Sequence, residues 1–99
     1  MKSRTEIISE IGNTLNNRSY NCLFNDNKRT INEYDIMAFN SKEIKIIKLY
    51  IFESMQDLND KKNKLGAINI EIPNYIIKEI WCYIKQFKIF KVYNIMGGE

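Results

Sequence analysis

Hydrophobic and polar positions alternate with helical spacing at the start of the chain. Residues 3–6 read Ser-Arg-Thr-Glu, the spacing of a capping box, in which serine and glutamate each accept a bond from the other's backbone N–H. Apolar residues follow at Ile7, Ile8, Ile11 and Leu15. This pattern forms one apolar helix face. We predict a helix over about residues 3–17.

Three extended segments are predicted next. Residues 20–24 alternate and predict a short strand, which a polar turn at 25–28 ends. A second extended segment runs from about 29 to 39, and a tight turn follows at 40–42. Residues 43–52 are apolar at both odd and even positions, which is typical of a central strand covered on both faces.

The second half of the chain contains one ambiguous segment. Residues 53–65 predict a short helix, or a helix followed by a loop at 60–64, that ends at Gly66, and residues 68–72 predict extended chain up to Pro73. Residues 75–87 fit a helix face by spacing, but their isoleucine, tryptophan and tyrosine content favours a strand. Spacing leaves both alternatives open. Residues 87–95 alternate and predict a final strand.

Composition narrows the protein class. Ninety-nine residues with 44% hydrophobic and 27% charged content indicate one globular domain, 1–99. No apolar run of membrane-spanning length and no signal peptide is visible, and Cys22 and Cys82 lack the spacing of metal ligands. We therefore expect a cytoplasmic protein with two free thiols and no membrane partner. A bias toward isoleucine, lysine and asparagine is typical of AT-rich coding, as in some prokaryotes, viruses and plasmids.

Charge and the missing residue types limit the chemistry. The net charge of +3 and a pI near 8.8 permit a nucleic-acid partner without requiring one. The chain has no histidine, which excludes His-based catalytic sites and His metal ligands. Any metal would have to be held by carboxylates, which suits Mg²⁺ or Mn²⁺.

One acid stands out in the hairpin predicted over 33–52. Asp35 lies within an apolar extended segment, and Lys48 and Tyr50 lie within the next one. The segments Tyr34–Phe39 and Glu43–Tyr50, with the strand pattern of 78–83 and 90–93 after Pro73, resemble the PD-(D/E)xK (restriction-endonuclease-like) superfamily, in particular small archaeal and viral resolvase-like nucleases. The resemblance implies an α/β (α+β) fold of order αβββαββ, with a central mixed sheet flanked by helices. It also favours a strand over 77–84.

The same resemblance implies a degenerate active site. Asp35 matches the first metal-binding acid, but Lys48 stands at the position of the second acid and Tyr50 at that of the catalytic lysine. Glu10, or Glu6, would match the acid that some resolvases add from the first helix. A lysine beside Asp35 would form a salt bridge in place of the metal. The site residues implied are therefore Asp35, Lys48 and Glu10.

Three functions follow as expectations. The first is a catalytically degenerate nuclease-fold protein that binds DNA or a protein partner without cutting and needs no cofactor. The second is an active Mg²⁺-dependent endonuclease or resolvase-like enzyme, in which Asp35 and a repositioned Glu10, Glu33 or Glu53 hold the metal. The third is a small interaction protein that forms a homodimer. The expected phosphate-contacting lysines are Lys61, Lys62, Lys64, Lys85, Lys88 and Lys91, and Trp81, Tyr83 and Tyr93 are expected more as core than as base-stacking residues.

Overall fold

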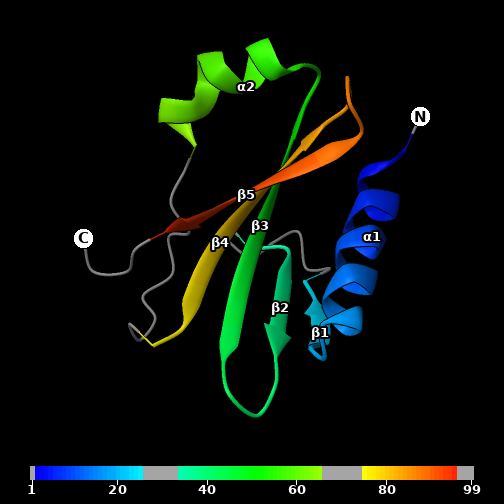
Figure 1. Ribbon diagram of the computed structural model, residues 1–99, viewed down its shortest axis with the longest axis vertical. Coiled ribbons are helices and arrows are strands. Elements are labelled where there is room, and N and C mark those ends of the chain that lie inside the picture. Colours follow the sequence, from blue (N-terminus) through cyan, green and yellow to red (C-terminus); the bar gives the residue numbers. More distant parts are fainter. Residues whose placement is uncertain (1, 26–33, 66–74, 96–99) are drawn as a thin grey trace.

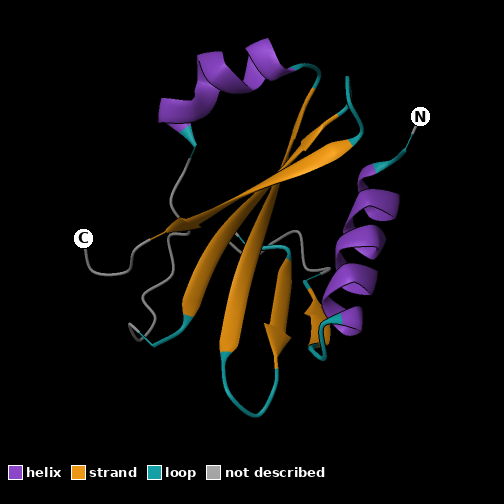
Figure 2. Cartoon of the chain, viewed as in Figure 1, coloured by secondary structure: helices purple, strands orange, loops and turns teal. Residues whose placement is uncertain are grey.

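The computed structural model describes residues 2–25, 34–65 and 75–95. Along these residues the order is α1 (Arg4–Asn17), β1 (Asn21–Phe24), β2 (Ile36–Phe39), β3 (Ile44–Phe52), α2 (Met55–Lys61), the 3₁₀ turn η1 (Lys62–Lys64), β4 (Ile77–Ile84) and β5 (Ile89–Ile95). The predicted αβββαββ order and the α+β class are confirmed (Figure 2). None of the helices in the described segments is long and apolar enough to cross a membrane.

The strands form one mixed sheet in the order β1-β2-β3-β4-β5. β3 and β4 pair in parallel, and the other neighbouring strands pair antiparallel. β3 is therefore the central strand, as its apolar pattern on both faces predicts. β4 also settles the ambiguity of the 75–87 segment, because Ile77–Ile84 is a strand in the interior of the sheet and not a helix.

Each helix covers a different part of the sheet (Figure 1). α1 lies along β1 and β2, where Ile7, Ile11 and Leu15 pack with Ile47 and Leu49 of β3 in the first core. α2 lies beyond the carboxyl end of β3, where Leu58 packs with the buried Phe52, Ile80, Cys82 and Ile84 in the second core. Strand residues that alternate between these two cores face opposite sides of the sheet. We call these the α1 face and the α2 face.

Local features explain where α1 begins and how closely it packs against the sheet. Ser3 caps the helix in the predicted capping box, and α1 begins at Arg4. Gly12 allows β1 to approach closely, because a Cβ at this position would lie 2.7 Å from Cζ of Phe24. Tyr20, directly before β1, packs against the first core.

The predicted segment boundaries differ from the structure at three points. α2 ends at Lys61 and is followed by η1, and β5 begins at Ile89 because residues 85–88 form a turn. β2 begins at Ile36, and Tyr34 and Asp35 precede it, so Asp35 does not lie inside a strand. The turn at 40–42 is confirmed, with the Asn40 side chain accepting from the N–H groups of Lys42 and Glu43 at 2.8 and 3.0 Å. The predictions for 26–33 and for Gly66 to Asn74 lie outside the described residues.

Candidate functional site

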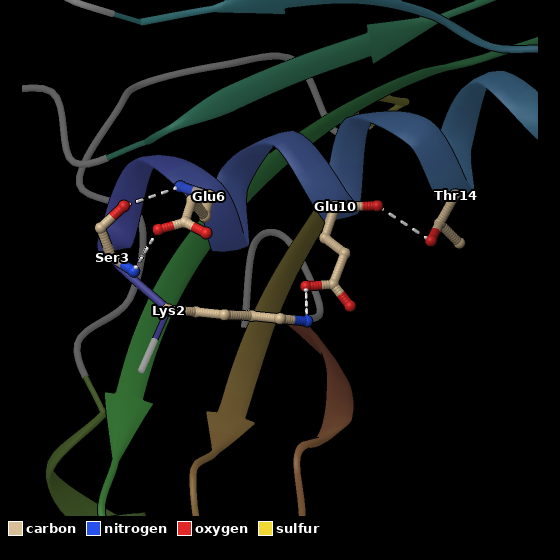
Figure 3. Close-up of polar contacts among 5 residues, drawn as sticks. All are labelled: Lys2, Ser3, Glu6, Glu10 and Thr14. Atoms are coloured by element: carbon tan, nitrogen blue, oxygen red, sulfur yellow. Dashed lines mark hydrogen bonds and ion pairs between the residues drawn. The ribbon is translucent and has the colours of Figure 1, made fainter.

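The first turn of α1 fixes the acids of that helix. Ser3 Oγ accepts from Glu6 N at 3.2 Å, and Ser3 N donates to Glu6 Oε1 at 3.1 Å (Figure 3). The bond from Ser3 N–H lowers the pKa of the Glu6 carboxyl, with a further contribution from the Ser3 hydroxyl. Glu10 forms an ion pair with Lys2, which lies along the outside of the helix. Both candidate helix acids therefore have partners in the residues directly before α1.

Asp35 is held by four groups of the chain, one of which is the backbone N–H of Asn25, which donates to Asp35 O at 2.9 Å. Its Oδ2 accepts from Leu49 N at 2.7 Å, and its Oδ1 accepts from Arg4 Nη2 at 3.0 Å. Its own N–H donates to Ile47 O at 2.8 Å. Arg4 Nη2 also donates to Leu49 O at 3.2 Å, so that the pair Arg4–Asp35 binds both backbone groups of Leu49. β2 does not extend far enough to pair with β3 at Leu49. The backbone N–H and carbonyl of Leu49 are therefore hydrogen-bonded by Asp35 and Arg4 instead.

The predicted Asp35–Lys48 salt bridge is wrong. Ile47 and Leu49 belong to the first core, so Lys48 between them faces the other side of the sheet. Lys48 Nζ lies 5.3 Å from the ring centroid of Tyr50, which packs against the second core. The ion-pair partner of Asp35 is Arg4, which lies on α1.

The Asp35 position does not fit a Mg²⁺ ion of the kind that the family resemblance implies. Mg²⁺ needs oxygen ligands in nearly octahedral geometry, usually with at least one further carboxylate. Here a guanidinium lies beside Oδ1, and Oδ2 accepts a backbone N–H. Within residues 2–25, 34–65 and 75–95 no group of three or more Asp, Glu or Cys side chains is arranged to hold a metal ion. Glu53 pairs with Lys85 at 3.1 Å, and Glu33 lies outside the described residues.

A second polar cluster lies on the α1 face and was not predicted from the sequence. Glu79 is 7% exposed, accepts from Lys45 Nζ at 3.2 Å, and accepts from Trp81 Nε1 at 3.0 Å. Lys45 also lies 5.0 Å from the ring centroid of Tyr20, whose hydroxyl donates to Glu43. Burial lowers the pKa of the Lys45 ammonium, but the charge and hydrogen bond of Glu79 outweigh it and raise the pKa above its ordinary value. The hydrogen bond to Glu43, with burial, raises the pKa of the Tyr20 hydroxyl.

This cluster is a satisfied internal network. Each Glu79 oxygen has a donor, and no buried side-chain nitrogen or oxygen in the described segments lacks a hydrogen-bond partner. A buried charge pair of this kind is costly to break. Its sequence signal is the pair of charges at Lys45 and Glu79 in neighbouring apolar strands, which alternation places on the same face.

The candidate phosphate-contacting lysines fall into two groups. The first group lies on α2, η1 and β5. Lys61 forms an ion pair with Asp57 at 3.0 Å, and Lys62 Nζ lies 5.5 Å from the ring centroid of Tyr93. Lys64 ends η1, and Lys91 is exposed on β5. Lys85 and Lys88 belong to the turn between β4 and β5, where Lys88 has a positive φ of 55°. The candidates therefore lie on the α2 face or at the β4–β5 turn.

The aromatic candidates separate by burial. Trp81 and Tyr83 are 4% and 3% exposed and belong to the first core, which confirms the expectation that they are core residues. Phe90 packs against both rings, at centroid distances of 5.6 and 5.1 Å. Tyr93 is half-buried against the second core. Only a partly exposed ring is available to stack on a base, and of these three aromatics only Tyr93 is partly exposed.

A cleft opens between the start of α1 and the β4–β5 turn. It has a volume of about 490 Å³ and is lined by Lys2, Glu6, Glu53, Tyr83, Lys85, Gln86 and Lys88. Lys2 and Lys85 are paired with glutamates, so most of the positive charge in this cleft is neutralised.

A scan of protein-family models and a search of curated proteins each found no match to this chain.

Proposed function

We propose that this protein is a non-cleaving relative of the PD-(D/E)xK nucleases that binds nucleic acid. The single observation that carries the non-cleaving part is the position of Asp35, whose two oxygens accept from Arg4 and Leu49. In a two-metal or one-metal nuclease the acid must be free to hold the cation that activates water. Here the guanidinium of Arg4 lies where a cation would, and Asp35 accepts a hydrogen bond from the backbone of β3.

The nucleic-acid part is supported by the distribution of lysines. Net charge is modest, but Lys62, Lys88 and Lys91 are exposed, and the structure gives none of them an ion pair with another described residue. Exposed lysines without carboxylate partners are those that release counterions when they meet phosphates. The α+β fold with its five-stranded mixed sheet is compatible with the nuclease-like architecture that the resemblance implies.

The test measures binding and cleavage separately. Labelled single-stranded, duplex and four-way-junction DNA are titrated with the protein at low salt, and the anisotropy of the label is followed. We expect binding of at least one form, weakening steeply as salt is added, because phosphate contacts release counterions. The same DNA is then incubated with the protein and Mg²⁺ or Mn²⁺. The proposal expects intact DNA, and binding to none of the forms would reject its nucleic-acid part.

Homodimerisation stays a prediction with a local basis in β5. This strand lies at one edge of the sheet, and Val92 on it is 46% exposed. An edge strand presents unpaired backbone groups to a second chain. Light scattering after size-exclusion chromatography gives the mass in solution directly, and the mass of a monomer would reject the dimer.

A further inference from the structure

Tyr93 lies at the centre of a group of lysines on the α2 face. Strand register pairs Tyr93 with Ile80 and pairs Lys78, two residues before Ile80, with Ile95. Lys78 is therefore a diagonal neighbour of Tyr93 on the same face, within reach of a long side chain. Lys91 precedes Tyr93 by two residues on β5 and shares this face. We call Lys62, Lys78, Lys91 and Tyr93 the Tyr93 surface.

The ring of Tyr93 combines a packed side and a polar side. It packs against the second core, and Lys62 Nζ lies 5.5 Å from its centroid. A cation–π contact at an exposed site is worth only about 0.5–1 kcal/mol, so an incoming group displaces the ammonium at small cost. The ring is thus held by its core contacts, is partly exposed, and has the ammonium of Lys62 beside it.

The strands carry only positive charge on their α2 face. Along the α2 face of β3, β4 and β5 the charged residues are all lysines: Lys48, Lys78 and Lys91. The acid of these strands, Glu79, faces the other side and is neutralised by Lys45. On α2, Asp57 is paired with Lys61, and Asp60 accepts from Gln56 Nε2 at 2.9 Å. Among the residues that the structure describes, no carboxylate forms an ion pair with Lys62, Lys78 or Lys91, so the Tyr93 surface places three positive charges around an aromatic ring.

We propose that the Tyr93 surface binds single-stranded nucleic acid. A base stacks on Tyr93, and the phosphates on either side of it meet Lys62, Lys78 and Lys91. This is the combination that sequence-tolerant single-strand binding uses, a stacking ring within a cationic surface. A duplex keeps its bases stacked inside the helix and offers no free base face to the ring. The inference rests on the proposed function and assigns the form of nucleic acid and its contact surface.

The experiment compares single strand and duplex on matched variants. Anisotropy titrations use an oligothymidine of about 12 nucleotides and a duplex of the same length, a span typical of such sites. We expect the wild type to bind the single strand more tightly than the duplex. Lys91→Glu should weaken single-strand binding by about tenfold at low salt and flatten its salt dependence. Lys42→Glu makes the same charge change on the exposed β2–β3 turn and should change affinity by less than about twofold.

Stacking is tested at Tyr93 itself. Tyr93→Phe keeps the ring and should bind within about twofold of the wild type, whereas Tyr93→Leu should lose about fivefold or more. Fluorescence of Trp81 checks that each variant is folded, and Lys91→Glu tests the surface independently of Tyr93 packing.

The outcomes separate the inference from the proposed function. Three results would overturn the inference: equal weakening by Lys91→Glu and Lys42→Glu, unchanged binding by Tyr93→Leu, or preference for duplex. In each of these cases the binding itself still supports the proposed function. If no nucleic acid binds to the wild type at low salt, both fail.

Discussion

Arg4 and Asp35 form an ion pair, Nη2 to Oδ1 at 3.0 Å, although 31 residues separate them in the chain. Arg4 also donates to the carbonyl of Leu49, and Asp35 accepts from the N–H of the same residue. The pair thus ties the first turn of α1 to the central strand. A carboxylate that resembles a nuclease acid is here a structural clamp between helix and sheet.

The clamp predicts a stability order among Asp35 variants. Asp35→Ala leaves the Leu49 N–H and the Arg4 guanidinium without their acceptor, and we expect a loss of about 1–3 kcal/mol in unfolding free energy. Asp35→Asn keeps an oxygen for the N–H and loses mainly the charge interaction, so it should cost clearly less. Urea unfolding followed by Trp81 fluorescence measures both. Equal stability of wild type and Asp35→Ala would contradict the structural role.

The buried network predicts strong coupling between Lys45 and Glu79. Glu79→Ala leaves a largely buried ammonium and the Trp81 N–H without their acceptor, and we expect a loss of about 3 kcal/mol. In the double variant with Lys45→Met the ammonium is also gone, so the combined loss should be smaller than the sum of the two single losses. A double-mutant cycle by urea unfolding measures the difference. Additive losses would show that the pair makes no net contribution.

Cys82 predicts a change in stability at alkaline pH. Its thiol is fully buried, and burial raises its pKa from 9.0 to about 11. A group whose pKa is raised in the folded state contributes stability that is fully present below pH 9 and is lost as pH rises through about 11, because the unfolded chain ionises first. Between these values the wild type should lose about 2 kcal/mol more than Cys82→Ala.

Unfolding of both proteins at a series of alkaline pH values tests this. The difference between them isolates Cys82 from the other groups whose pKa is raised in the folded protein, among them Lys45 and Tyr20. Parallel curves for the two proteins would show that the thiol ionises equally well in the folded state.

Much of the fold could be predicted from the sequence, because its signals are local. The capping box at Ser3 and Glu6 marks the start of α1, and apolar residues on both faces of Ile44–Phe52 mark a central strand. Spacing does not decide the 75–87 segment, since isoleucine at Ile77, Ile80 and Ile84 fits both a helix and a buried strand, and the pairing of β4 within the sheet settles it.

The candidate site could be predicted only in part, because its contacts are long-range. The sequence shows Asp35 as an acid next to apolar residues, but its ion-pair partner Arg4 lies on α1, and no sequence spacing connects the two residues. The expected Asp35–Lys48 pair rests on motif positions, whereas strand alternation puts Ile47 and Leu49 in the first core and Lys48 on the opposite face. Alternation also gives the shared face of Lys45 and Glu79, and of Lys91 and Tyr93.

One measurement tests binding without cleavage directly. A labelled single strand and a labelled duplex are incubated with the wild type, with Asp35→Ala and with no protein, in Mg²⁺ and then in Mn²⁺. Each sample is divided between a native gel, which shows binding, and a denaturing gel, which shows cleavage. We predict a retarded single strand on the first gel and full-length DNA on the second for both proteins. Shortened DNA with the wild type that disappears with Asp35→Ala would contradict this and assign Asp35 to catalysis.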